Sequence, residues 1–162
     1  MWSCNRRWFL FSAAAVGGCG FTPVYGPNGI GHTLRGQVQI DTPDTPDTYR
    51  LVRYIEERLG HAPNPVFGLS YSLGSREEGL AVTASQIIER YNILGDLSYA
   101  LRRLDDMTVV ASGKVSGMTA YSASGTTVAT RAAQRDAYER LMVLLGDRMI
   151  TQLLMTLPKG AA

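Results

Sequence analysis

A long run of alternating side chains, from residue 87 to residue 102, most restricts what this chain can fold into. Apolar and polar residues follow one another along it, which is typical of a β-strand with one buried and one exposed face. The apolar side comprises Ile87, Tyr91, Ile93, Leu97, Tyr99 and Leu101, and the polar side comprises Arg90, Asn92, Asp96, Ser98 and Arg102. A sheet built from such strands needs helices on its apolar face.

Three further stretches have the same two-residue period. Residues 34–40 and 67–73 each predict a half-buried strand, and residues 108–121 predict a fourth strand that is rich in valine, threonine, glycine and alanine. Residues 75–79 fit either a turn or a bulge in a longer strand that resumes at Leu80. The chain therefore contains the strands of a mostly antiparallel sheet.

Residues 41–48 have an acid at every third position, a spacing that suggests a metal site. A calcium loop would also need a central glycine and a closing glutamate, and neither is present. The segment instead predicts a turn and a helix start, with Thr45 as the N-cap and Pro46 at the first helical position. The helix ends at Gly60. Its apolar face comprises Leu51, Val52, Ile55 and Leu59.

The last apolar segment, Ala129 to Leu157, lacks proline and has helical spacing. Polar residues interrupt it too often for a membrane-spanning helix. From Leu141 onward its apolar residues exceed one stripe, and exposed apolar patches usually mark interfaces. We therefore predict that one side covers the sheet and the other meets a partner. The outward candidates are Leu144, Ile150 and Met155.

Together these segments predict one α+β domain over residues 34–158. It is a two-layer sandwich, with two helices packed on one face of a four-stranded, mostly antiparallel sheet.

The N-terminus has the features of an export signal. Arg6 and Arg7 precede a short apolar run, which ends in Val16-Gly17-Gly18-Cys19. This ending resembles the bacterial lipobox, which implies removal of residues 1–18 and attachment of diacylglycerol and an N-acyl chain (such as palmitate) to Cys19. The paired arginines fit a twin-arginine signal and also an ordinary basic n-region, so both export routes remain open.

Residues 19–33 are rich in glycine and proline and predict a flexible tether. Of 16 basic residues in the whole chain, Arg6 and Arg7 leave with the signal, so 14 remain against 14 acids. This balance gives no overall attraction to nucleic acid. Cys19 is the one thiol of the mature chain, which excludes an internal disulfide.

The start of the mature chain, Cys19-Gly20-Phe21-Thr22-Pro23-Val24-Tyr25-Gly26, resembles that of the LptE family. The predicted order of strands and helices also matches that family. The resemblance implies a lipid-anchored lipoprotein on the periplasmic side of the outer membrane. It would bind lipopolysaccharide and support or plug the LptD β-barrel during lipopolysaccharide assembly. The alternative is a periplasmic scaffold lipoprotein of another envelope complex.

No set of residues predicts catalysis. His32 lies in the tether and His61 in a proline-rich turn, and neither has a partner that suggests a triad or a metal site. Gly113-Lys114 lacks the spaced glycine of a phosphate loop. We expect no enzyme activity, no metal and no cofactor besides the lipid on Cys19.

Four basic residues near strand ends are candidate contacts for the phosphates of lipopolysaccharide: Arg76, Arg102, Arg103 and Lys114. Cations at sheet tips can hold phosphate by charge-assisted hydrogen bonds. The alternative is that they are solvated turn residues that keep sheet edges from pairing.

Overall fold

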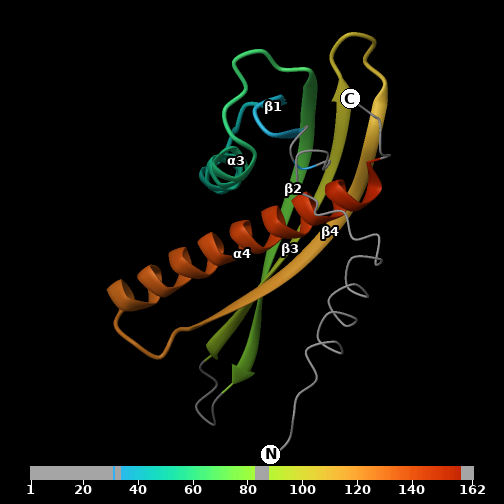
Figure 1. Cartoon of the computed structure of the whole chain (residues 1–162). Helices are drawn as coiled ribbons and strands as arrows, with labels where there is room; N and C mark the ends of the chain where they lie inside the picture. The colour runs from blue at the N-terminus through green and yellow to red at the C-terminus, as the bar shows by residue number, and fades with distance from the viewer. Residues whose placement is uncertain (1–30, 32–33, 83–87, 158–162) are drawn as a thin grey trace, which may run out of the picture.

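The computed structural model describes residues 31, 34–82 and 88–157. Both helices lie on one side of the sheet (Figure 1), so the predicted α+β fold with two helices on a four-stranded, mostly antiparallel sheet is confirmed. The elements are, in chain order, β1 (Val38–Ile40), α3 (Pro46–Leu59), β2 (Phe67–Val82), β3 (Ile88–Arg103), β4 (Val109–Ser122) and α4 (Thr127–Thr156).

The strands lie side by side in chain order, β1-β2-β3-β4. β1 runs parallel to β2, with Val38 opposite Phe67, whereas β3 is antiparallel to both β2 and β4. Leu97 of β3 lies opposite Leu73 of β2 and Val115 of β4. Because residues opposite one another share a face, this register gathers the apolar residues of the three strands on the side of the helices.

The first strand is shorter than the predicted residues 34–40, since only Val38–Ile40 is extended and paired. Gly36 explains the difference. Its φ of +72° lies in the left-handed region that glycine adopts readily, and its N–H donates to the carbonyl of Leu59 at 2.7 Å. The chain therefore turns onto the end of α3 before it enters the sheet, and Leu34 is buried in that turn.

The second strand continues through residues 75–79, for which the sequence fits either a turn or a bulge in a longer strand. Residues 75–79 pair with β3 without interruption, so they form no turn, and the register shifts only between Gly79 and Val82. Arg76 is therefore a residue within a strand, opposite Leu94 of β3. The turn is therefore wrong and the longer strand is confirmed, with its change of register after residue 79.

Helix α3 begins and ends as the sequence predicts. The Thr45 hydroxyl accepts from the Thr48 N–H at 3.2 Å, and the Thr48 hydroxyl accepts from the Thr45 N–H at 2.9 Å. This reciprocal capping, with Pro46 in the first turn, satisfies donors that a helix start leaves free. Gly60 ends the helix with a φ of +82°. The predicted apolar face, comprising Leu51, Val52, Ile55 and Leu59, is buried.

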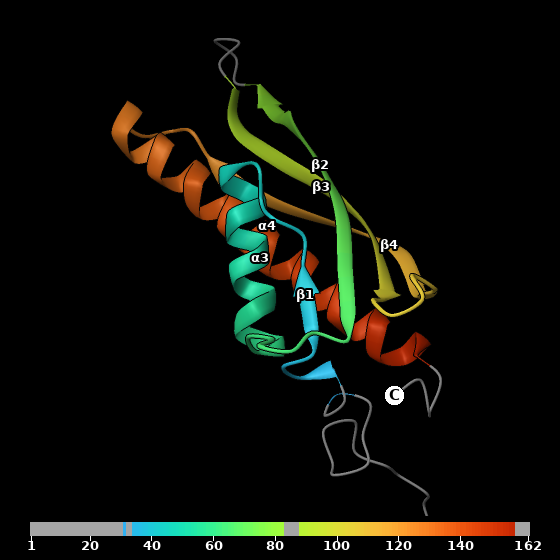
Figure 2. The same ribbon diagram turned by 90° about the horizontal axis from the view of Figure 1, so that it is seen from above.

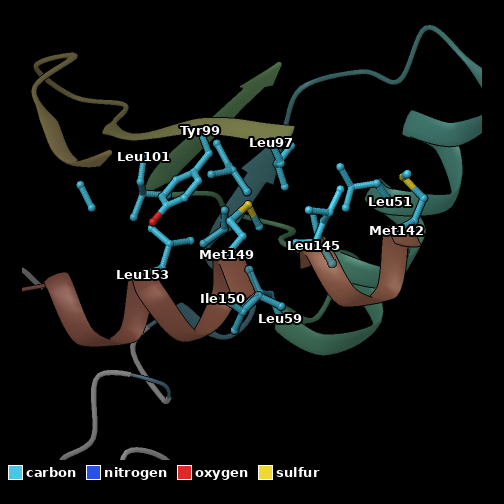
Figure 3. Close-up of a cluster of buried hydrophobic side chains, with 14 of the residues drawn as sticks. Leu51, Leu59, Leu97, Tyr99, Leu101, Met142, Leu145, Met149, Ile150 and Leu153 are labelled. Atoms are coloured by element: carbon cyan, nitrogen blue, oxygen red, sulfur yellow. The ribbon is translucent and has the colours of Figure 1, made fainter. Parts of the chain in front are cut away.

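Helix α4 crosses the sheet obliquely, with α3 beside it on the same face (Figure 2). Side chains from β3 point towards those of α4 in the core between them (Figure 3). The core contacts shown there include Leu97, Tyr99 and Leu101 of β3 and Leu145, Met149 and Leu153 of α4, all buried. Burial of this apolar surface is the main stabilising contribution to the domain.

The two helices are in close contact at Gly146 of α4. A Cβ atom on this residue would lie 2.7 Å from Cδ1 of Tyr54 in α3, so the contact depends on the missing side chain. The Tyr54 hydroxyl donates to Oδ1 of Asp147 at 2.7 Å, and Arg58 lies 3.5 Å from the same oxygen. Burial, followed by the hydrogen bond to Asp147, raises the pKa of Tyr54. These contacts fix α3 against α4.

Candidate functional site

The sheet face turned away from the helices carries polar side chains from β2, β3 and β4. Arg76, Asp96 and Lys114 come from these three neighbouring strands and meet on this face. Nη1 of Arg76 lies 3.7 Å from Oδ2 of Asp96, and Nζ of Lys114 lies 3.4 Å from its Oδ1. The side chains of Arg76 and Lys114 are 60% and 63% exposed. Arg76 also donates from Nε to Oε1 of Glu78 at 3.0 Å, so an anionic ligand competes with Glu78 as well as with Asp96.

Arg76 and Asp96 line a groove of about 500 Å³, and Lys114 lies next to it through its ion pair with Asp96. Leu94 and Met118 give it an apolar part, and Met118 is 56% exposed. Arg148 reaches it from α4 and donates a hydrogen bond to the Ser116 carbonyl on the outer edge of β4. The groove thus places exposed cations beside apolar surface, which suits an amphiphile with an anionic head group.

Arg102 and Arg103 do not belong to this group. Arg102 lies eight residues along β3 from Leu94, which is opposite Arg76, and four from Ser98, which is opposite Lys114; these spans are roughly 26 Å and 13 Å. Arg103 is near Asp105 of the following turn, with 3.9 Å between Nε and Oδ1. The structure therefore brings together Arg76 and Lys114 of the four predicted cations and separates the other two.

Asp96 and Arg148 belong to the site but were not among the predicted residues. Asp96 stands on the polar side of the alternating run, so the sequence shows its face but not its partners on other strands. Arg148 comes from a helix far along the chain, and nothing in its local sequence indicates that it reaches over the edge of β4.

The predicted outward face of α4 needs a correction. Ile150 is only 2% exposed and lies near Leu59 of α3 (Figure 3), so its predicted outward position is wrong. Leu144 is half-buried and reaches over Gly117 of β4, where a Cβ would lie 3.0 Å from its Cδ2. Met155 is 78% exposed. The excess apolar surface is covered because α3 packs on a second side of α4.

Met155 borders a second groove, of about 440 Å³, between α4 and β4. Val115 lies on its sheet side, and Thr151 and Gln152 lie on its helix side. Of the three predicted partner contacts, Met155 alone projects from the domain next to a hollow that a partner side chain could enter.

A separate polar cluster holds the first half of α4 to the far end of the sheet. Glu77 of β2 accepts hydrogen bonds from the Tyr121 hydroxyl and from Nε2 of Gln134, the latter at 3.0 Å. Tyr121 stacks on Tyr91, with ring centroids 5.3 Å apart. Burial, and then the Glu77 hydrogen bond, raises the pKa of Tyr121. The bonds from Glu77 serve to position α4.

The described residues show no cluster of three or more histidine, cysteine, aspartate or glutamate side chains suited to a metal ion. His61 is exposed in the segment after α3. No helix within the described ranges has the length and apolar character to cross a membrane. The predicted signal (residues 1–18), the lipidated Cys19, the tether (residues 19–33) and His32 lie outside the described residues, apart from residue 31.

Neither a protein-family model nor a curated protein matches this chain. Solved structures do match. A candidate lipoprotein from Caulobacter crescentus has a TM-score of 0.65 at 16% identity, covering 77% of this chain and 93% of its own. Rare lipoprotein B from Shewanella oneidensis has a TM-score of 0.55 at 12% identity, with 74% and 93% covered. A minor lipoprotein from Acinetobacter baumannii has a TM-score of 0.55 at 14% identity, with 78% and 97% covered.

These structures are matched over most of their own length, so the likeness extends across the described domain. At such low identity it establishes the arrangement of helices and strands and leaves the site residues undetermined. The chain has the fold of these bacterial lipoproteins.

Proposed function

We propose that this chain is a lipoprotein of the LptE type, anchored through Cys19 on the periplasmic side of the outer membrane. In this proposal it binds lipopolysaccharide and supports or plugs the LptD barrel. Two independent observations support it. The fold is shared with bacterial lipoproteins, rare lipoprotein B among them, and the segment from Cys19 to Gly26 resembles the start of the LptE family.

The observation that supports the lipid-binding part is that Arg76, which lines the groove with Leu94 and Met118, shares Asp96 with Lys114 on the open face. Lipopolysaccharide presents phosphates next to acyl chains. Guanidinium and ammonium groups hold phosphate by charge-assisted hydrogen bonds, while the apolar part of the groove can take one end of an acyl chain. Both cations are largely exposed, so binding them requires little desolvation.

Asp96 has a defined role in this arrangement. Its carboxylate lies between Arg76 and Lys114, which reduces the repulsion of the two cations in the unbound protein. It also repels an incoming phosphate. At about 4 Å in water-like surroundings one unit charge contributes about 1 kcal/mol, equivalent to roughly a fivefold change in affinity.

The barrel-supporting part of the proposal rests on the C-terminal end of α4. Met155 is exposed there beside a groove formed with Val115, and apolar side chains next to a hollow are common anchors of protein interfaces. We place the barrel contact at this position. The proposed work is binding and plugging, with no bond made or broken.

Titration of the full chain in detergent with fluorescent lipopolysaccharide tests the lipid-binding part. Replacing both Arg76 and Lys114 by alanine should weaken binding about 10- to 30-fold, since two exposed cations contribute about 1 kcal/mol each. A matched control replaces Arg53 and Arg131, two exposed arginines from α3 and α4, and removes the same net charge. Equal weakening by both pairs would mean that only overall charge matters and would contradict a specific site.

Asp96→Asn provides a change of the opposite sign. Removing the carboxylate should tighten lipopolysaccharide binding roughly fivefold at low salt, with a smaller gain at high salt. Weaker binding by Asp96→Asn, with an unchanged fold by circular dichroism, would show that phosphate does not sit between Arg76 and Lys114.

A further inference from the structure

The outer edge of β4 is open along most of its length. β4 is the last strand of the sheet, and within residues 31, 34–82 and 88–157 no other strand pairs with it on this side. Backbone groups of alternate residues point outward along such an edge. The outward residues are Ser112, Lys114, Ser116, Met118 and Ala120. An edge of this kind is a template for an added strand.

Two arginines of α4 occupy part of this edge. Arg148 donates to the carbonyl of Ser116, and Nη2 of Arg140 donates to the carbonyl of Ala120 at 3.1 Å. Both side chains reach over the strand from the helix, so they take the places that N–H groups of a neighbouring strand would fill. Arg140 also pairs with Asp136 at 2.5 Å, whereas no ion pair of Arg148 is present among the described residues.

Two grooves lie on either side of the contact between Arg148 and Ser116. The groove that contains Leu94 and Met118 and the groove that contains Met155 share Ser116 and Arg148, so the edge is accessible from both sides. The side chain of Arg148 therefore separates the two grooves along β4. The outward residues from Ser112 to Ala120 span eight residue steps, or roughly 27 Å, which exceeds the length of an ordinary strand.

We infer that β4 accepts an extended segment of a partner protein as a fifth strand, and that this segment carries two acidic side chains four residues apart. The incoming backbone takes over the carbonyls of Ser116 and Ala120, and the released guanidinium groups of Arg148 and Arg140 bind the two carboxylates. Because Ser116 and Ala120 are four residues apart, acids at i and i+4 lie on one face of the added strand and reach both arginines.

Charge favours this occupant over a second copy of the chain. Lys114 and Arg140 are each paired with an aspartate of their own chain, whereas Arg148 has no such pair among the described residues. Pairing of β4 with β4 of another copy around Ser116 would bring Arg148 of one molecule against Arg148 of the other, and like charges facing each other are destabilising. Arg148 thus discourages self-association and favours an acidic strand. This inference concerns the backbone edge and does not depend on lipid binding by the open face.

The test uses the full chain in detergent and two synthetic nine-residue peptides of equal composition. Both contain two glutamates among threonines and valines, at i and i+4 in one peptide and at i and i+3 in the other. Binding is measured by fluorescence anisotropy up to millimolar peptide, and added hydrogen bonds by amide hydrogen exchange at Met118. The i, i+4 peptide should bind at least about tenfold tighter and slow exchange at Met118.

Met118→Pro and Met118→Ala form a matched pair. Both remove the side chain, but only proline removes the outward N–H, and an edge strand tolerates it. Met118→Pro should weaken the i, i+4 peptide about tenfold relative to Met118→Ala. Ser75→Pro places the same change on the opposite edge, in β2, and should have no effect. The inference is overturned if both peptides bind equally or if neither binds at millimolar concentration. It is also overturned if Met118→Pro binds the i, i+4 peptide as well as Met118→Ala does, or if Ser75→Pro abolishes binding.

Discussion

The contact between α3 and α4 at Gly146 provides a quantitative test of the helix packing. In Gly146→Ala the new Cβ would lie 2.7 Å from Cδ1 and 3.1 Å from Cε1 of Tyr54. Carbon atoms in contact ordinarily stay about 3.5–4.0 Å apart, so the ring must move by about 1 Å. The ring cannot move freely, because its hydroxyl is bound to Asp147, the residue after Gly146.

Two opposing free energies decide the result. Alanine is favoured over glycine inside a helix by about 1 kcal/mol. Overpacking of a fixed contact costs about 1–3 kcal/mol, and moving the Tyr54 ring also weakens its hydrogen bond to Asp147. The net prediction is that Gly146→Ala lowers the free energy of unfolding by about 1–2 kcal/mol.

Urea unfolding of a double-mutant cycle measures the two contributions separately. In a Tyr54→Ala background the obstacle is gone, so Gly146→Ala should now stabilise the domain by about 1 kcal/mol. Ala132→Gly, at an exposed position of the same helix, calibrates the intrinsic preference and should cost about the same amount. If Gly146→Ala stabilises the natural chain, or has the same effect in both backgrounds, the helices do not touch as the structure shows.

Three further predictions concern the anchor, α4 and pH. Cys19→Ala should leave the chain unprocessed or soluble, because several acyl chains at about 0.8 kcal/mol per buried methylene otherwise retain it; continued cleavage and membrane retention without a partner would contradict this. Ile150→Asp should unfold the domain, whereas Met155→Asp should leave thermal unfolding unchanged and reduce recovery of the barrel partner; the reverse pattern would exclude the proposed contact. Burial raises the pKa values of Tyr99 and Tyr121, so the folded state holds their protons more tightly. The contribution of these two tyrosines to the free energy of unfolding should therefore be fully present below the ordinary tyrosine pKa of 10.0 and be lost as pH rises above it. A urea midpoint that does not change with pH in that range would contradict the burial.

Local sequence predicts much of the fold because the relevant signals are short in range. Thr45, Pro46 and Gly60 mark both ends of α3 through capping and backbone geometry, which act within a few residues. The extent of β1 could not be predicted in the same way. Gly36 fits an alternating pattern, but its left-handed turn is set by a hydrogen bond to Leu59, which is distant in the chain.

The candidate site depends on register and on packing between elements, which local patterns do not contain. Arg76 reaches Lys114 through Asp96 only because three strands are aligned in one register. The burial of Ile150 follows from α3 lying against a second side of α4, whereas the sequence shows only that α4 has excess apolar surface. A stripe of apolar residues indicates that something covers it and does not distinguish a neighbouring helix from a partner protein.

The proposed function is tested most directly by purification of the full chain, with a C-terminal tag, from detergent-solubilised outer membranes. Mass spectrometry identifies the recovered proteins, and a phosphate assay measures bound lipopolysaccharide. We predict recovery of an intact LptD barrel together with lipopolysaccharide, and loss of the lipid when Arg76 and Lys114 are both replaced by alanine. Recovery of a different envelope complex, without the barrel and without lipopolysaccharide, would contradict the proposal and favour a scaffold lipoprotein.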